Sequence, residues 1–162
     1  FRRVLFRSSG FTPTDAGLIP TGEILPVEGT PLDFRTPHAI GERIGRTDYE
    51  PLAFGNGYDH NWVLDKPEAG TVSLAAEAYE PATGIRMKIY TDQQGLQFYA
   101  GQGMDGKEVG KRGDRHNFRS GIALETQNFP DAPNHDNFPS SVLRPGETYT
   151  QHTVYAFETD EQ

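Results

Sequence analysis

The chain has 162 residues, the length of one ordinary domain, and it contains 18 Gly and 12 Pro. Its 7 Tyr, 10 Phe and 1 Trp need a core or a ligand face, so we expect a folded, loop-rich chain. A net charge of −8 repels a phosphate backbone, which argues against a nucleic-acid partner. No apolar run is long enough to span a membrane. The absence of cysteine excludes disulfides, a thiol nucleophile and Cys-based metal sites.

The first seven residues mix basic and apolar side chains, without an initiator Met or the apolar stretch of a signal peptide. Three interpretations stay open: a native strand, a cloning or assembly scar, and the tail of a truncated native segment. The last two would mean that the chain begins inside a longer protein.

Four prolines interrupt residues 11–36 and favour ordered loop, with room for a short edge strand over 21–27. Thr36 and Pro37 form a typical helix start, and a glycine follows Ile44. These signals predict one short helix over 38–44.

From residue 54 onward the apolar residues recur with period 2, which indicates half-buried strands. Residues 80–84 have the length and composition of a hairpin loop. In the strand expected over 71–79, Val72, Leu74, Ala76 and Ala78 are expected on one face. Many short strands and almost no helix predict an all-β sandwich or barrel. The expected strands are 61–64, 71–79, 85–90, 96–99, 122–124 and 149–157.

Three short segments, 55–62, 95–101 and 124–131, place carboxylates or amides beside aromatic rings. That mixture suits a sugar, because rings stack on C–H faces while carboxylates and amides bind hydroxyls. Each segment also has a simpler reading as a turn or a solvated strand end. Asp59 and Glu125 are the carboxylates that could form an acid/base pair of the glycosidase type, which requires a fixed separation.

Other chemistries have little support in the sequence. The five histidines, at positions 38, 60, 116, 135 and 152, show no metal-ligand spacing. The serines at 120, 140 and 141 lack the G-x-S-x-G setting of a hydrolase nucleophile.

From about Gly10 to its end, the chain resembles the C-terminal half of the aldose 1-epimerase (galactose mutarotase) family. The segment Leu124–Ala132, which reads Leu-Glu-Thr-Gln-Asn-Phe-Pro-Asp-Ala, is the most specific match. The resemblance implies part of an all-β β-supersandwich with at most one short helix, and it leaves residues 1–9 outside the matched 10–162. The other matching stretches, in family order, are 19–22, 33–35, 57–61, 97–99 and 143–147.

The resemblance also implies an isomerase that interconverts the α and β anomers of a small-molecule aldose such as glucose or galactose, without metal or cofactor. By position, Glu125 is expected to be the catalytic general base, and Asp59 and Gln97 to bind substrate. The family's general acid is a histidine upstream of this region, and neither His38 nor His60 occupies its position. We therefore expect a fragment that carries the base side of the site and could be inactive alone.

Three alternatives remain: a carbohydrate-binding β-sandwich without turnover, a hexose-6-phosphate 1-epimerase, and a glycoside hydrolase. The second would need Arg or Lys side chains converging on the site, and nothing in the sequence places the arginines at 35, 86, 115 and 119 together. Half of a sandwich is also expected to expose an apolar patch and unpaired strand edges. The preferred aldose and the oligomeric state stay open, as does the compartment, with the cytoplasm favoured.

Overall fold

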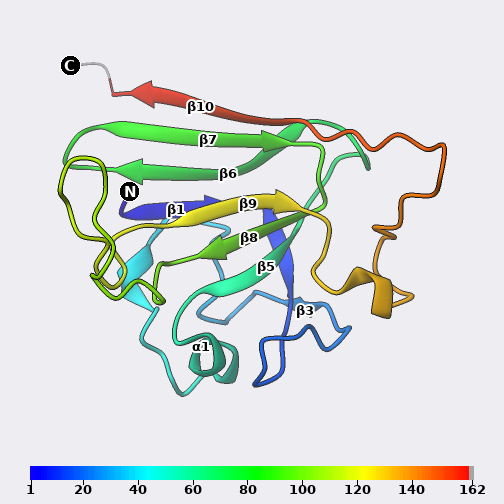
Figure 1. Ribbon diagram of the computed structural model, residues 1–162, viewed down its shortest axis with the longest axis horizontal. Coiled ribbons are helices and arrows are strands. Elements are labelled where there is room, and N and C mark those ends of the chain that lie inside the picture. The colour runs from blue at the N-terminus through cyan, green and yellow to red at the C-terminus, as the bar shows by residue number, and fades with distance from the viewer. Residues whose placement is uncertain (161–162) are drawn as a thin grey trace.

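The computed structural model describes residues 1–160 and consists of two antiparallel five-stranded sheets (Figure 1). The first sheet has the order β10 (Thr153–Thr159), β7 (Ile85–Thr91), β6 (Ser73–Glu80), β1 (Arg3–Phe6) and β4 (His38–Ala39). The second has the order β3 (Leu25–Pro26), β2 (Ser8–Thr12), β5 (Asp59–Leu64), β8 (Gly95–Tyr99) and β9 (Ala123–Gln127). The expected all-β class is confirmed.

Aromatic rings from both sheets pack against each other and form the core. The Phe6 ring on β1 lies 4.9 Å from that of Trp62 on β5 and 5.4 Å from that of Phe98 on β8. Trp62 donates its indole N–H to the Leu32 carbonyl at 3.1 Å, and this bond ties the proline-rich loop to the core. Edge-to-face contacts of this kind add to the free energy of burial.

The expected strands are present, with shifted ends. The edge strand foreseen within 21–27 is reduced to β3, and the 80–84 loop joins β6 to β7. The expected face of the 71–79 strand is altered by a bulge between Leu74 and Ala76, which leaves Ala75 and Ala76 both buried. Val72 lies outside the strand and is exposed. Period 2 alone cannot reveal such an extra residue.

The helix predicted over 38–44 is wrong. His38–Ala39 is strand β4, paired with β1, and only Ile40–Glu42 turns, as the 3₁₀ helix η1. The N–H of Ile40 donates to the Arg2 carbonyl at 2.8 Å. Pairing with β1 therefore takes the backbone groups that a helix would need, and tertiary context overrides the local start signal.

The α-helix of the described chain is α1 (Glu50–Gly55), which Figure 1 shows on the side of the molecule away from β10. Pro51 lies in its first turn, where a missing N–H costs nothing. Asn56 ends it in the left-handed conformation, at φ 50°. A second 3₁₀ helix, η2 (Ala132–Asn134), follows β9. Within residues 1–160 no helix has the length and apolar character needed to cross a bilayer.

Candidate functional site

A cavity of about 480 Å³ lies on the second sheet, on the face opposite the core. This volume is in the usual range of small-molecule sites. The lining comes from β2, β5, β8, β9 and the loops beside them: Thr12, Thr14, Leu18, Pro20, Asp59, His60, Asn61, Gln97, Tyr99, Glu125, Gln127 and Pro130.

Strand register places a polar row across the floor of this cavity. Thr12 on β2 pairs with Asn61 on β5, Asn61 pairs with Gln97 on β8, and Gln97 pairs with Glu125 on β9. Side chains directly opposite each other in neighbouring strands lie on one face, so all four point the same way. Asp59 is two residues from Asn61 and lies on that face too.

The three residues singled out from the sequence thus line one cavity. The Gln97 side chain donates from Nε2 to Oδ1 of Asp59 at 2.8 Å, which fixes the orientation of its amide. The other end of that amide, Oε1 of Gln97, is buried without a hydrogen-bond partner in the described chain. The Thr14 hydroxyl at the same cavity is also buried and unpartnered. Buried polar atoms without partners are costly, so these two atoms suit a ligand that donates and accepts hydrogen bonds.

Sequence reasoning did not single out Asn61 and Gln127, which extend the polar floor. Asn61 is buried, donates from Nδ2 to the Thr12 hydroxyl at 3.4 Å, and accepts from Nε2 of Gln127 at the same distance. Gly95 makes room for them, because a Cβ there would collide with Oδ1 of Asn61. The available signal was the i, i+2 spacing of polar residues in all three segments, at 59 and 61, 97 and 99, and 125 and 127.

Loop residues and one aromatic side chain form the walls. Tyr99 lies on the same face as Gln97, and its hydroxyl accepts the N–H of Gly103 at 2.7 Å. The lining also includes Pro20, whose carbonyl accepts from Nε2 of His135 at 3.1 Å. Asn137 donates to the Gly22 carbonyl at 2.8 Å, so two distant loops are joined beside the cavity.

His60 borders the cavity but is committed to the fold. Its Nδ1 accepts the backbone N–H of Asp59 at 3.1 Å, so Nε2 carries the proton and donates to the Pro51 carbonyl at 3.0 Å. Burial lowers the pKa of His60 to about 4. The ring is therefore neutral at physiological pH and anchors α1 to β5.

The charge in this cavity is negative. Asp59 and Glu125 are its carboxylates, and no Lys or Arg belongs to its lining. The Glu125 side chain is exposed, whereas Asp59 is half-buried under its bond from Gln97. In the part of the chain that the structure describes, no group of three or more acidic or His side chains could hold a metal ion. One exposed carboxylate beside amides and a hydroxyl can bind hydroxyl groups and accept a proton from one of them.

Comparison with known proteins identifies the family of the chain. The sequence model of the aldose 1-epimerase family matches residues 2–156, so the match begins earlier than the expected Gly10. Galactose mutarotase of Rattus norvegicus is 40% identical over 154 residues, and aldose 1-epimerase of Escherichia coli K12 is 34% identical over 150. These matches cover 95% and 91% of this chain, but only 43% and 42% of the relatives. The chain thus spans less than half the length of these curated relatives.

Two solved structures share the fold. An aldose epimerase homologue from C. elegans superposes with a TM-score of 0.84 at 30% identity, over 98% of this chain and 46% of its own. Galactose 1-epimerase from Lactobacillus acidophilus gives a TM-score of 0.78 at 24% identity, over 98% and 44%. The resemblance drawn from the sequence motifs is confirmed, and the chain belongs to the aldose 1-epimerase family.

Proposed function

We propose that the cavity binds a free aldose and that this chain supplies the base side of an aldose 1-epimerase site. The observation that carries the proposal is the polar row that ends at Glu125, beside the unpartnered Oε1 of Gln97. In this proposal Asp59 and Gln97 bind sugar hydroxyls. A carboxylate accepts hydrogen bonds from hydroxyls, and the free amide oxygen takes one more.

Anomer exchange needs two coupled proton transfers. The Glu125 carboxylate takes the proton of the C1 hydroxyl, the C1–O5 bond breaks, and C1 becomes an aldehyde carbon. The ring oxygen takes a proton from a general acid and becomes the C5 hydroxyl. Rotation about the C1–C2 bond presents the other aldehyde face, and ring closure returns both protons.

The general acid is the missing part of this scheme within the described chain. Among the five histidines only His60 borders the cavity, and its low pKa leaves it neutral near pH 7. His38 is paired with Glu42 on the first sheet. We therefore expect the chain to bind sugar but to accelerate anomer exchange weakly, if at all.

The lack of a general acid at the cavity in the described chain favours a second candidate, a sugar-binding domain without turnover. The two differ in one measurable quantity, the rate of anomer exchange at saturating sugar. A phosphorylated hexose is disfavoured, because the cavity offers carboxylates and no cationic side chain to a phosphate.

Binding and turnover are tested separately. NMR titration of the 162-residue chain with D-galactose should shift the amides of Asn61 and Gln97, and Asp59→Ala should weaken the affinity about tenfold, because it removes a charged hydrogen-bond acceptor. Galactose 6-phosphate should bind no more tightly than galactose. Lack of any binding by the unaltered chain contradicts the proposal.

Polarimetry of fresh α-D-galactose measures turnover. If the chain accelerates anomer exchange, Glu125→Gln should lower the catalysed rate by roughly 10²- to 10⁴-fold, the usual contribution of a general base. Glu68→Gln, a change at an exposed loop carboxylate away from the cavity, is the matched control. Full activity in Glu125→Gln would overturn the base assignment. Binding without acceleration would favour the non-catalytic candidate.

A further inference from the structure

Within residues 1–160, strand β9, which carries Glu125, is an edge strand that pairs only with β8. The pairing of β8 with β5 shows which way the backbone groups of β9 point. The N–H of Ala100 donates to the Tyr58 carbonyl, so the even-numbered residues of β8 direct their backbone N–H and C=O groups toward β5. Gln97 therefore faces β9 and pairs with Glu125. The backbone groups of the residues on either side of Glu125 point away from β8.

Two side chains from the other sheet take those outward carbonyls. The Tyr155 hydroxyl on β10 donates to the Leu124 carbonyl at 2.9 Å. The Gln151 side chain, just before β10, donates from Nε2 to the Thr126 carbonyl at 2.9 Å and lies 3.0 Å from its hydroxyl. The carbonyls immediately before and after Glu125 are thus both held from the first sheet.

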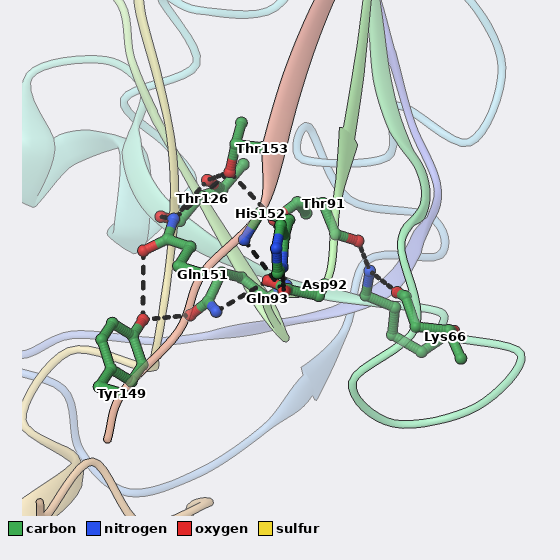
Figure 2. Close-up of polar contacts among 10 residues, drawn as sticks. Lys66, Thr91, Asp92, Gln93, Thr126, Tyr149, Gln151, His152 and Thr153 are labelled. Atoms are coloured by element: carbon green, nitrogen blue, oxygen red, sulfur yellow. Dashed lines mark hydrogen bonds and ion pairs between the residues drawn. The ribbon is translucent and has the colours of Figure 1, made fainter.

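The orientation of Gln151 is itself fixed by a polar network, shown in Figure 2. The two contacts of Nε2 with Thr126 orient the Gln151 amide, and the Tyr149 hydroxyl lies 3.1 Å from Oε1 of both Gln151 and Gln93, either of which can accept its single proton. The hydroxyls of Thr126 and Thr153 are 2.6 Å apart, and that of Thr153 reaches the Thr91 hydroxyl at 3.3 Å. The network therefore joins β9 to β10 and β7.

The Glu125 carboxylate has no such support of its own. Its side chain is exposed, and within residues 1–160 no hydrogen bond or ion pair holds it. Its position over the cavity consequently depends on the backbone of β9. Tyr155 is near enough for the Glu125 charge to matter, since burial and that charge both raise the pKa of its phenol.

We propose that Gln151 and Tyr155 are positioning residues for Glu125, acting as a two-point clamp on the free edge of β9. This inference rests on the proposed function, in which Glu125 is the general base. It adds Gln151 and Tyr155, which lie well after Glu125 in the sequence, to the residues that support the site. An edge strand with unbonded outer carbonyls moves more readily than a clamped one. The clamp keeps the Glu125 carboxylate beside Gln97, on the face of the sheet that would contact the sugar.

The test compares Tyr155→Phe and Gln151→Leu with Tyr79→Phe, in the full 162-residue chain and without sugar. Each change removes a hydrogen-bonding group and keeps most of the side-chain volume. Tyr79 on β6 is the matched control, because its hydroxyl donates to the carboxylate of Asp160, which follows β10, and not to β9. Amide hydrogen exchange by NMR should accelerate roughly tenfold at Glu125 and Gln97 in the two clamp variants, while exchange in the β6–β7 pair, at Ile89 for example, stays unchanged.

A spectroscopic signature separates positioning from general stabilisation. The ¹³C resonance of the Glu125 carboxylate should shift in both clamp variants and stay in place in Tyr79→Phe. Unchanged exchange at Glu125, or equal acceleration in both sheets, would overturn the proposal. The sugar titration is an independent arm: a chain that binds no galactose contradicts the proposed function, while the exchange pattern still decides whether the clamp exists.

Discussion

The imidazole of His60 stabilises the fold only in its neutral form, because Nδ1 must accept the Asp59 N–H. Its pKa is about 4 in the folded chain, against 6.5 for an unperturbed histidine. Between these values the unfolded chain binds a proton that the folded chain does not, so the free energy of unfolding rises with pH. The contribution, about 3 kcal/mol by linkage, is complete above pH 6.5 and is lost as the pH falls toward 4.

Urea unfolding at pH 5 and pH 7 measures this effect. The unaltered chain should gain about 2 kcal/mol more than His60→Gln between the two pH values, since glutamine does not titrate. Titration of the carboxylates affects both proteins alike and cancels in the comparison. An equal gain in both proteins would contradict the assignment of a neutral, buried His60.

Helix α1 ends because its C-cap residue, Asn56, adopts the left-handed backbone conformation. Asn56 has φ 50°, and its N–H donates to carbonyls of the last turn. A left-handed backbone costs a residue with an ordinary Cβ about 1 kcal/mol more than it costs Gly, and Asn tolerates it better than most. Asn56→Ala should therefore lower the free energy of unfolding by about 1 kcal/mol, and Asn56→Gly should change it by a few tenths only. Urea unfolding checks both, and equal losses would contradict this account.

At the scale of elements, the sequence predicts what depends on local pattern and misses what depends on pairing. Period 2 located the strands, because burial of one sheet face imposes it. The helix start at Thr36 and Pro37 misled, because the residues that follow it, His38 and Ala39, pair with β1 instead of forming helical hydrogen bonds. No local signal in the sequence reports a pairing partner that far along the chain. At the site, motifs named Asp59, Gln97 and Glu125, but only the register of β5, β8 and β9 brings them to one face of the sheet, with Gln97 paired to Glu125 and Asp59 paired to Tyr99 beside them.

The clamp on β9 lies beyond reach of sequence reasoning for the same reason. Gln151 and Tyr155 look like ordinary members of an alternating strand. Their donors meet the carbonyls beside Glu125 only because the two sheets lie face to face, so that residues far apart in the chain become neighbours.

At the scale of the whole molecule, a groove of about 490 Å³ lies open between the two sheets, lined mostly by apolar residues and also by Arg119 and Ser120. Its lining includes Met87, Leu124 and Phe157, and the Phe157 side chain is 66% exposed. In the described part of the chain, strand β10 is also an edge of the first sheet, paired with β7 on one side and with no strand on the other. The exposed patch and free edges expected from the sequence are therefore present, and contiguous apolar surface of this kind favours association.

We predict that the chain binds a hydrophobic dye and associates as its concentration rises, through this groove. Raising the salt concentration should strengthen association, because the net charge of −8 opposes contact between copies and salt screens that repulsion. Phe157→Asp should reduce both dye fluorescence and association, since it replaces the exposed apolar side chain of the groove with a charged one. Val142→Asp is the matched control, as Val142 is 57% exposed but lies outside the groove. Size-exclusion chromatography over a concentration series gives the readout, and a dye-negative monomer at every concentration would contradict the prediction.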